Sequence, residues 1–148
     1  MNNSLNPLSL RIDRPLESWR VEILRVIDAA LQVSKCPYML VGATARDLLL
    51  FHVYGGPSMR ATQDVDFAIA VDSWARFATV LNGVLLNEGF RAQQRIDHRV
   101  LFTSATIKDV PVDIIPFGGI AAKDGTITWS RDMDLVMNVA GFEEALSA

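Results

Sequence analysis

The sequence has little cysteine and no excess of positive charge. Cys36 is the single cysteine among 148 residues. It excludes a disulfide framework and leads us to expect a reducing, cytoplasmic compartment. The formal net charge is −3, whereas a protein that grips a nucleic-acid backbone over a broad surface is usually basic. We therefore expect any contact with nucleic acid to be a local patch.

Membrane-spanning and secretory segments are also missing. No apolar stretch reaches the roughly 18 residues that a bilayer span needs. The first ten residues lack a basic start followed by an apolar run, so we expect no signal peptide. Half of the residues are hydrophobic, which is typical of a globular domain with a real core. We expect residues 1–12 to form a flexible arm and residues 13–148 to form one domain.

Hydrophobic periodicity predicts an α+β (α/β) fold. Apolar residues recur every three or four positions after Pro15, which indicates an amphipathic helix that covers one face of a sheet. Strict alternation over 64–71 indicates a strand. The predicted elements are a helix over 15–34, a strand over 38–41, a helix over 43–52, a strand over 64–71, a helix over 74–89, strands over 99–105 and 110–116 joined by a short turn that contains 108–109, a strand over 126–129 and a helix from 142.

Two aspartates stand one residue apart on the strand over 64–71. Strand side chains at positions i and i+2 point to the same face, so Asp64 and Asp66 share a side. Two carboxylates so close repel each other unless a cation neutralises them or one keeps its proton. Hard oxygen ligands suit Mg²⁺ or Mn²⁺. The pair therefore predicts a metal site, and the alternative is the solvated face of an edge strand.

Asp113 is the candidate for a third carboxylate. It is the only acid inside the otherwise apolar strand over 110–116, where an unpartnered charge is costly. On a strand next to the first, it would complete a two-metal arrangement with Asp64 and Asp66.

A glycine separates the strand over 38–41 from the helix that follows. Gly42 permits a tight turn and close backbone approach, and the next helix directs free N–H groups toward an anion. Gly42 and Ala43 are therefore interpreted either as a phosphate cradle or as a packing feature. Arg46 would reach a phosphate, or pair with Asp47 or a strand carboxylate. Thr62 would offer a hydroxyl to a nucleotide, or cap the strand.

The remaining polar residues carry weaker signals. His52 and His98 lack the spacing typical of zinc ligands. His98 would contact a nucleotide phosphate or simply pack. Arg95 and Arg99 flank it, either as a basic edge for triphosphate or RNA or as solvated side chains. No Ser–His–Asp or Cys–His nucleophile pattern is visible.

These motifs together resemble a known superfamily. Val41-Gly42-Ala43, Asp64-Val65-Asp66 and the later Asp113 resemble the nucleotidyltransferase (polymerase-β-like) signature of a glycine turn, two alternate aspartates and a third acid on another strand. Residues 60–67 and 112–120 are most similar to AbiEii-type nucleotidyltransferases, which occur among toxin components of toxin–antitoxin and abortive-infection systems. The resemblance covers most of the chain.

The resemblance implies a nucleotidyltransferase-like fold, with a mixed β-sheet of about four to five strands flanked by helices. It implies transfer of a nucleoside monophosphate from an NTP to an acceptor hydroxyl of tRNA, another RNA or a protein, and an antitoxin partner. The implied sites are catalytic and metal-binding Asp64, Asp66 and Asp113, with Mg²⁺ or Mn²⁺, and nucleotide-binding Gly42, Ala43, Arg46 and Thr62.

Two features depart from the family pattern. Ala43 stands where the family usually has Gly or Ser, and the helical C-terminal part, which commonly supplies a further Lys and Asp, has no room in this sequence. A non-catalytic nucleotide-binding or protein-interaction module therefore stays open as an alternative. A second alternative is an enzyme similar to tRNA CCA-adding enzymes and poly(A) polymerases, which residues 40–50 also resemble.

Overall fold

The computed structural model describes residues 12, 14–57, 64–129 and 135–147. Most of the predicted arm over 1–12, and Thr62, lie outside the described residues. The elements in chain order are α1 (Ser18–Val33), β1 (Tyr38–Val41), α2 (Gly42–Asp47), the π-helical segment η1 (Leu48–Val53), β2 (Val65–Ala70), α3 (Trp74–Leu85), β3 (Phe90–Ala92), β4 (Arg99–Phe102), β5 (Val110–Phe117), β6 (Thr126–Thr128), β7 (Val136–Asn138) and α4 (Phe142–Ser147).

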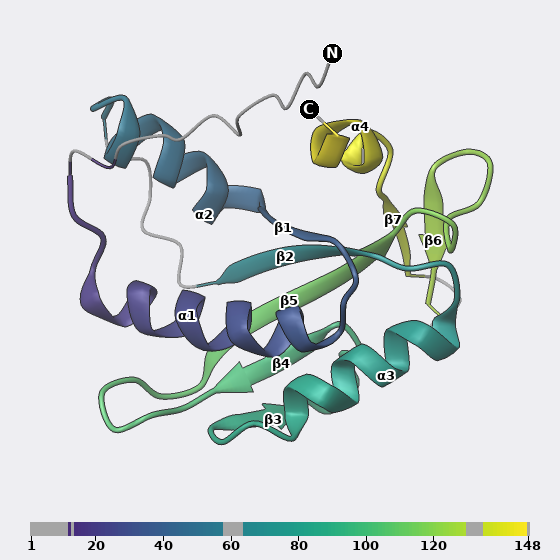
Figure 1. Cartoon of the computed structure of the whole chain (residues 1–148), viewed down its shortest axis with the longest axis horizontal. Coiled ribbons are helices and arrows are strands. Elements are labelled where there is room, and N and C mark those ends of the chain that lie inside the picture. The colour runs from purple at the N-terminus through teal and green to yellow at the C-terminus, as the bar shows by residue number, and fades with distance from the viewer. Residues whose placement is uncertain (1–11, 13, 58–63, 130–134, 148) are drawn as a thin grey trace, which may run out of the picture.

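Five strands form one mixed sheet in the order β1-β2-β5-β4-β3. The inner strands β2 and β5 run parallel, and the other neighbouring pairs are antiparallel. Helices α1 and α3 lie over one face of this sheet, while β6 and β7 form a separate hairpin near α4 (Figure 1). The predicted α+β fold, a mixed sheet flanked by helices, is confirmed. In the described part of the chain, no helix is long and apolar enough to cross a membrane.

The core lies between the sheet and the two long helices. Alternate residues of β2 and β5 point into it, because successive strand side chains face opposite sides. Full burial of a Val, Leu, Ile or Phe side chain stabilises a fold by about 1.5–3 kcal/mol. Buried members of this core include Ile23, Ile27, Leu31, Val65, Phe67, Ile69, Phe77, Val80, Val84, Val112 and Ile114. By the same alternation, Asp64, Asp66 and Asp113 belong to the other face of the sheet.

The predicted hairpin forms, but its loop was predicted wrongly. The first strand ends at Phe102 and the second begins at Val110, so the loop covers 103–109 in place of a short turn. Asp109 adopts a left-handed φ of 51°, and its N–H donates to Thr103 Oγ1 at 3.0 Å. This contact closes the loop and moves the strand register relative to a tight turn.

The ends of the other helices and strands differ less from the predicted ones. The helix after β1 starts at Gly42 and becomes π-helical over Leu48–Val53. The long first helix begins at Ser18, because Pro15 lies ahead of the helical hydrogen bonds. Two short strands, β3 and β7, were not predicted. Ser73 is the N-cap of α3 and accepts from the Arg76 backbone N–H at 3.1 Å.

Candidate functional site

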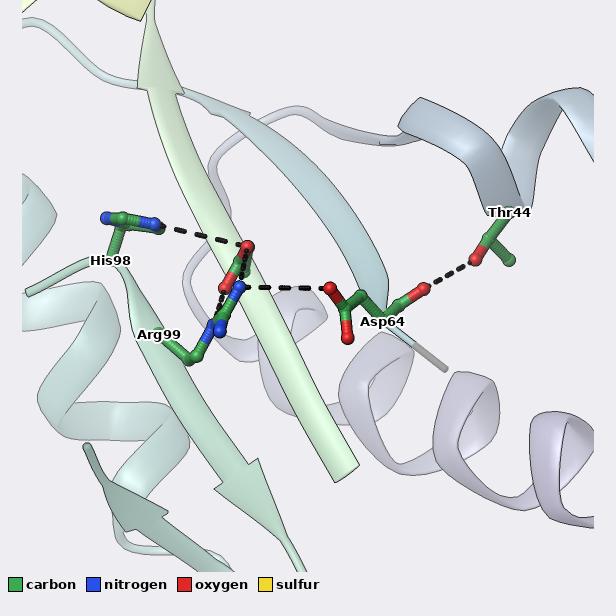
Figure 2. Close-up of polar contacts among 5 residues, drawn as sticks. Thr44, Asp64, His98 and Arg99 are labelled. Carbon is green, nitrogen blue, oxygen red and sulfur yellow. Dashed lines mark hydrogen bonds and ion pairs between the residues drawn. The ribbon is translucent and has the colours of Figure 1, made fainter. Parts of the chain in front are cut away.

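The parallel register of β2 and β5 sets two predicted site residues side by side. Asp66 on β2 is the register partner of Asp113 on β5, and Asp64 directly precedes β2. The Asp64 carbonyl oxygen accepts a hydrogen bond of 2.8 Å from Thr44 Oγ1 on α2 (Figure 2). Helix α2 is thereby tied to the acidic end of β2. The structure gathers Asp64, Asp66 and Asp113 into an acidic cluster on the sheet face opposite the helical core.

Gly42 lies against this acidic cluster. Its φ is +71°, in the region that glycine adopts without steric cost. A Cβ added at Gly42 would stand 2.3 Å from Asp66 Oδ2, a distance that no real side chain tolerates. The turn from β1 into α2 therefore requires glycine twice, once for its backbone angle and once for the Asp66 carboxylate. Ala43 follows in the first turn of α2.

Arg99 binds the third carboxylate with both arms of its guanidinium. Its Nε donates to Asp113 Oδ1 at 2.6 Å, and its Nη2 donates to Asp113 Oδ2 at 2.9 Å. The two residues are register partners on β4 and β5. The same Nη2 lies 3.9 Å from Asp64 Oδ2, and Figure 2 shows Arg99 reaching toward Asp64 across β5. Such bidentate charge-assisted pairs are among the stronger hydrogen bonds in proteins.

The pKa values follow this charge arrangement. The pKa of Asp66 is raised to about 6, mainly by burial and then by the negative charges of Asp113 and Asp64, against the opposing effect of Arg99. The hydrogen bond to Asp113 raises the pKa of Arg99, which keeps the guanidinium charged. Asp66 thus holds a proton more readily than an ordinary aspartate when no further cation is present.

The two other candidates are Arg46 and His98. The Arg46 side chain is half exposed, with Nε 3.8 Å from Asp47 Oδ1, so the structure shows the pairing with Asp47 that the sequence left open. His98 packs its ring 5.2 Å from that of Trp129, and its Nε2 is 3.9 Å from Asp113 Oδ2. Burial lowers the pKa of His98, which favours the neutral imidazole. Packing, the second sequence interpretation of His98, matches this geometry.

The donor chemistry of the acidic cluster fits a hard divalent cation. Asp64 keeps half of its side chain exposed. The pKa of Asp66 is raised by burial and by the negative charges of Asp113 and Asp64, which a cation would neutralise. Over residues 12, 14–57, 64–129 and 135–147, however, no three Asp, Glu, His or Cys side chains converge closely enough to hold a metal ion. In this arrangement the Arg99 guanidinium is hydrogen-bonded to both carboxylate oxygens of Asp113.

Sequence reasoning treated Arg99 as a basic edge and did not pair it with Asp113. The missing information was the register of the hairpin. A loop centred at Thr106 sets Arg99 opposite Asp113, whereas the predicted turn at 108–109 would have paired Asp113 with a different residue. The sequence alone does not give this register.

Comparisons with known proteins give fold likeness at low identity. No protein-family model matches the chain, and no curated protein matches it significantly. Similar solved structures include ANT(2″)-Ia in complex with adenylyl-2″-tobramycin, at 20% identity and a TM-score of 0.49 over 74% of this chain and 60% of that chain. The solution structure of the antibiotic-resistance factor ANT(2″)-Ia is 17% identical to this chain, with a TM-score of 0.46. The match covers 84% of this chain and 64% of that chain.

A third similar structure is the Thermotoga maritima CCA-adding enzyme complexed with tRNA, at 15% identity and a TM-score of 0.42 over 89% of this chain and 32% of that chain. The chain spans less than two thirds of each of these proteins. At TM-scores below 0.5 these likenesses do not assign the chain to a family.

Proposed function

We propose that the chain is a metal-dependent nucleotidyltransferase domain of the polymerase-β-like superfamily, which moves a nucleoside monophosphate from an NTP to an acceptor hydroxyl. The observation that carries the proposal is the parallel register of β2 and β5. It sets Asp66 beside Asp113, with the Gly42 turn pressed against the Asp66 carboxylate. Carboxylates next to a glycine turn and a helix start suit a triphosphate that arrives with its cation.

The residues take separate roles in this proposal. Asp64, Asp66 and Asp113 would hold Mg²⁺ or Mn²⁺, which when bound neutralises triphosphate charge and lowers the pKa of the acceptor hydroxyl. Backbone N–H groups at Gly42 and Ala43 bind the phosphates. Arg46 on α2 and Thr62 are further proposed nucleotide contacts, and the half-exposed Arg46 side chain is accessible to a ligand.

The reaction needs no covalent intermediate with the protein. The acceptor hydroxyl oxygen bonds to the α-phosphorus of the NTP, and the bond from that phosphorus to its bridging oxygen breaks. Pyrophosphate leaves, and the hydroxyl proton passes to a carboxylate of the acidic cluster. The chain contributes positioning of the two reactants and neutralisation of charge.

A finer proposal concerns the biological setting. Residues 60–67 and 112–120 resemble AbiEii-type toxins, so we propose that the acceptor is an RNA or a protein and that an antitoxin controls the activity. Incubating the protein with each α-labelled NTP, Mg²⁺ and total RNA and protein extracts tests the acceptor class. Label in the tRNA fraction, in other RNA or in a protein band identifies which class accepts the nucleotide.

The same assay tests the site. Asp66→Asn removes a carboxylate of the acidic cluster, and we expect it to lower label transfer by at least 100-fold, in the range that loss of a metal-assisted step costs. Asp72→Asn makes the same chemical change at an exposed position beyond the other end of β2 and should retain activity. Undiminished transfer by Asp66→Asn contradicts the proposed site.

A non-catalytic nucleotide-binding or protein-interaction module is the second candidate, and the Arg99–Asp113 pair favours it. A carboxylate held by both its oxygens serves structure without any metal. Thermal denaturation with NTP, Mg²⁺ and both together separates the two candidates. Stabilisation that requires both and disappears in Asp64→Ala supports the enzyme, while stabilisation by neither supports the interaction module.

A further inference from the structure

A positively charged side chain, that of Arg99, lies beside the acidic cluster. Asp66 and Asp113 are register partners on neighbouring strands, and Asp64 lies two residues before Asp66. Carboxylates on the same face of adjacent strands repel one another unless positive charge neutralises them. The Arg99 guanidinium supplies that charge: it binds Asp113 with two hydrogen bonds and approaches Asp64 to 3.9 Å. Arg99 therefore contacts two of the three members of the acidic cluster, Asp113 and Asp64.

This arrangement restricts the approach of a second cation to Asp113. Both oxygens of Asp113 accept from Arg99 at 2.6 and 2.9 Å, and the Asp113 side chain is 12% exposed. A divalent cation shared between Asp113 and either β2 aspartate would compete with the guanidinium for these carboxylate oxygens. It would also be repelled by a guanidinium that stays beside Asp64.

We propose that Arg99 is a built-in counter-cation that exchanges with the divalent metal ion at Asp113. When the metal is away, Arg99 neutralises Asp113 and Asp64 and holds the acidic cluster together. When the metal binds, Arg99 releases Asp113. The exchange rests on the proposed metal site and adds to it a positioning residue that sets the affinity for the metal. Arg99 makes metal binding weaker, because each binding event must first break a charge-assisted bidentate pair.

Mn²⁺ binding to the full chain at pH 7.5 and low salt tests the exchange. Electron paramagnetic resonance follows free Mn²⁺, whose sharp signal is lost on binding. We expect Arg99→Gln to bind Mn²⁺ at least tenfold more tightly than the natural chain. Arg91→Gln is the matched control, because Arg91 pairs with the exposed Asp109 at 2.8 Å on another part of the sheet. It makes the same change in net charge and should leave Mn²⁺ affinity within twofold.

A second variant keeps the test sharp. Arg99→Lys retains the charge but cannot donate from a planar fork, so its Mn²⁺ affinity should lie between those of the natural chain and Arg99→Gln. Should Arg99→Gln fold only when Mn²⁺ is added, that dependence also supports the exchange. A purely structural role for Arg99 would weaken Mn²⁺ binding in both variants, the opposite direction.

Two results overturn the proposal in distinguishable ways. Equal Mn²⁺ affinity of the natural chain, Arg91→Gln and both Arg99 variants means that Arg99 does not compete with the metal, while the metal site itself stands. Absence of Mn²⁺ binding by every protein, the natural chain included, overturns the metal site and the exchange with it.

Discussion

At Gly42, two constraints act on one residue. The φ of +71° is open to glycine at no steric cost, and the absent Cβ leaves space for Asp66 Oδ2. The backbone angle alone would also admit asparagine, which sometimes adopts a left-handed conformation. Together they leave glycine as the one residue that keeps the turn and the carboxylate where they are.

Gly42→Ala should therefore damage both stability and the site. We expect a loss of about 1–3 kcal/mol in the free energy of unfolding, from a strained φ and a displaced Asp66 side chain, together with loss of label transfer. Gly83→Ala in α3 is the control, because a Cβ there meets nothing within 4 Å, and it should stabilise by up to about 1 kcal/mol. Urea denaturation of both variants measures the difference, and an undisturbed Gly42→Ala would contradict the contact with Asp66.

Asp66 makes stability depend on pH. Its pKa in the folded chain is about 6, above the value of about 3.9 for an unfolded aspartate. The folded state therefore binds the proton more tightly, so the stabilising contribution is complete below about pH 4 and is lost as pH rises through 6.

Asp66→Asn cannot ionise and removes this dependence. Without divalent metal, we expect the stability of Asp66→Asn relative to the natural chain to increase between pH 4 and pH 7 by on the order of 1–2 kcal/mol, after allowance for partial exposure. Denaturation of both proteins at several pH values isolates the effect of this one carboxyl. A stability difference that does not change with pH would show that Asp66 ionises normally.

At the scale of elements, α3 depends on its N-cap. Ser73 has extended backbone, and its Oγ accepts from the Arg76 N–H. Ser73→Ala leaves that N–H without its partner and should cost about 1 kcal/mol. Thr79→Ala, on the exposed face of the same helix, should change the free energy of unfolding by less than about 0.5 kcal/mol. Equal effects of the two variants in thermal denaturation would rule out the cap.

The sequence predicted elements whose side-chain pattern is local. Alternation identified β2, helical spacing identified α1 and α3, and a glycine marked the end of β1. Strand β3 was missed because its three residues carry no pattern of their own. It forms by pairing with β4, where Phe90 packs on Phe102 with ring centroids 4.9 Å apart.

The three aspartates of the candidate site could be predicted from the sequence, whereas the pairing of Arg99 with Asp113 could not. Asp64, Asp66 and Asp113 stand out because a carboxylate is unusual at those strand positions. The partner of Asp113 depends on the register of β4 and β5, which the loop over 103–109 fixes. That loop closes through Asp109 and Thr103, contacts that no periodicity reveals, so Arg99 could be assigned only from the structure.

At the scale of the whole molecule, the two faces of the sheet are covered differently. Helices α1 and α3 lie over one face (Figure 1), and by strand alternation the acidic cluster belongs to the other. Substitutions of Asp64 and Asp66 therefore do not alter the side chains between the sheet and these two helices. This separation makes Asp66→Asn and Asp64→Ala usable as tests of activity in a folded chain.

The pairing of Arg99 with Asp113 also has a kinetic consequence for folding. Strands β4 and β5 are close in sequence, whereas β2 meets β5 only after a long segment of chain has closed. Because local contacts form at lower entropic cost than distant ones, the hairpin delivers Asp113 to β2 with its charge already neutralised. Arg99→Gln should therefore refold several-fold more slowly than Arg91→Gln in stopped-flow experiments at low salt, and the gap should close at high salt, where charge repulsion is screened. Equal refolding rates with faster unfolding would place the ion pair after the transition state.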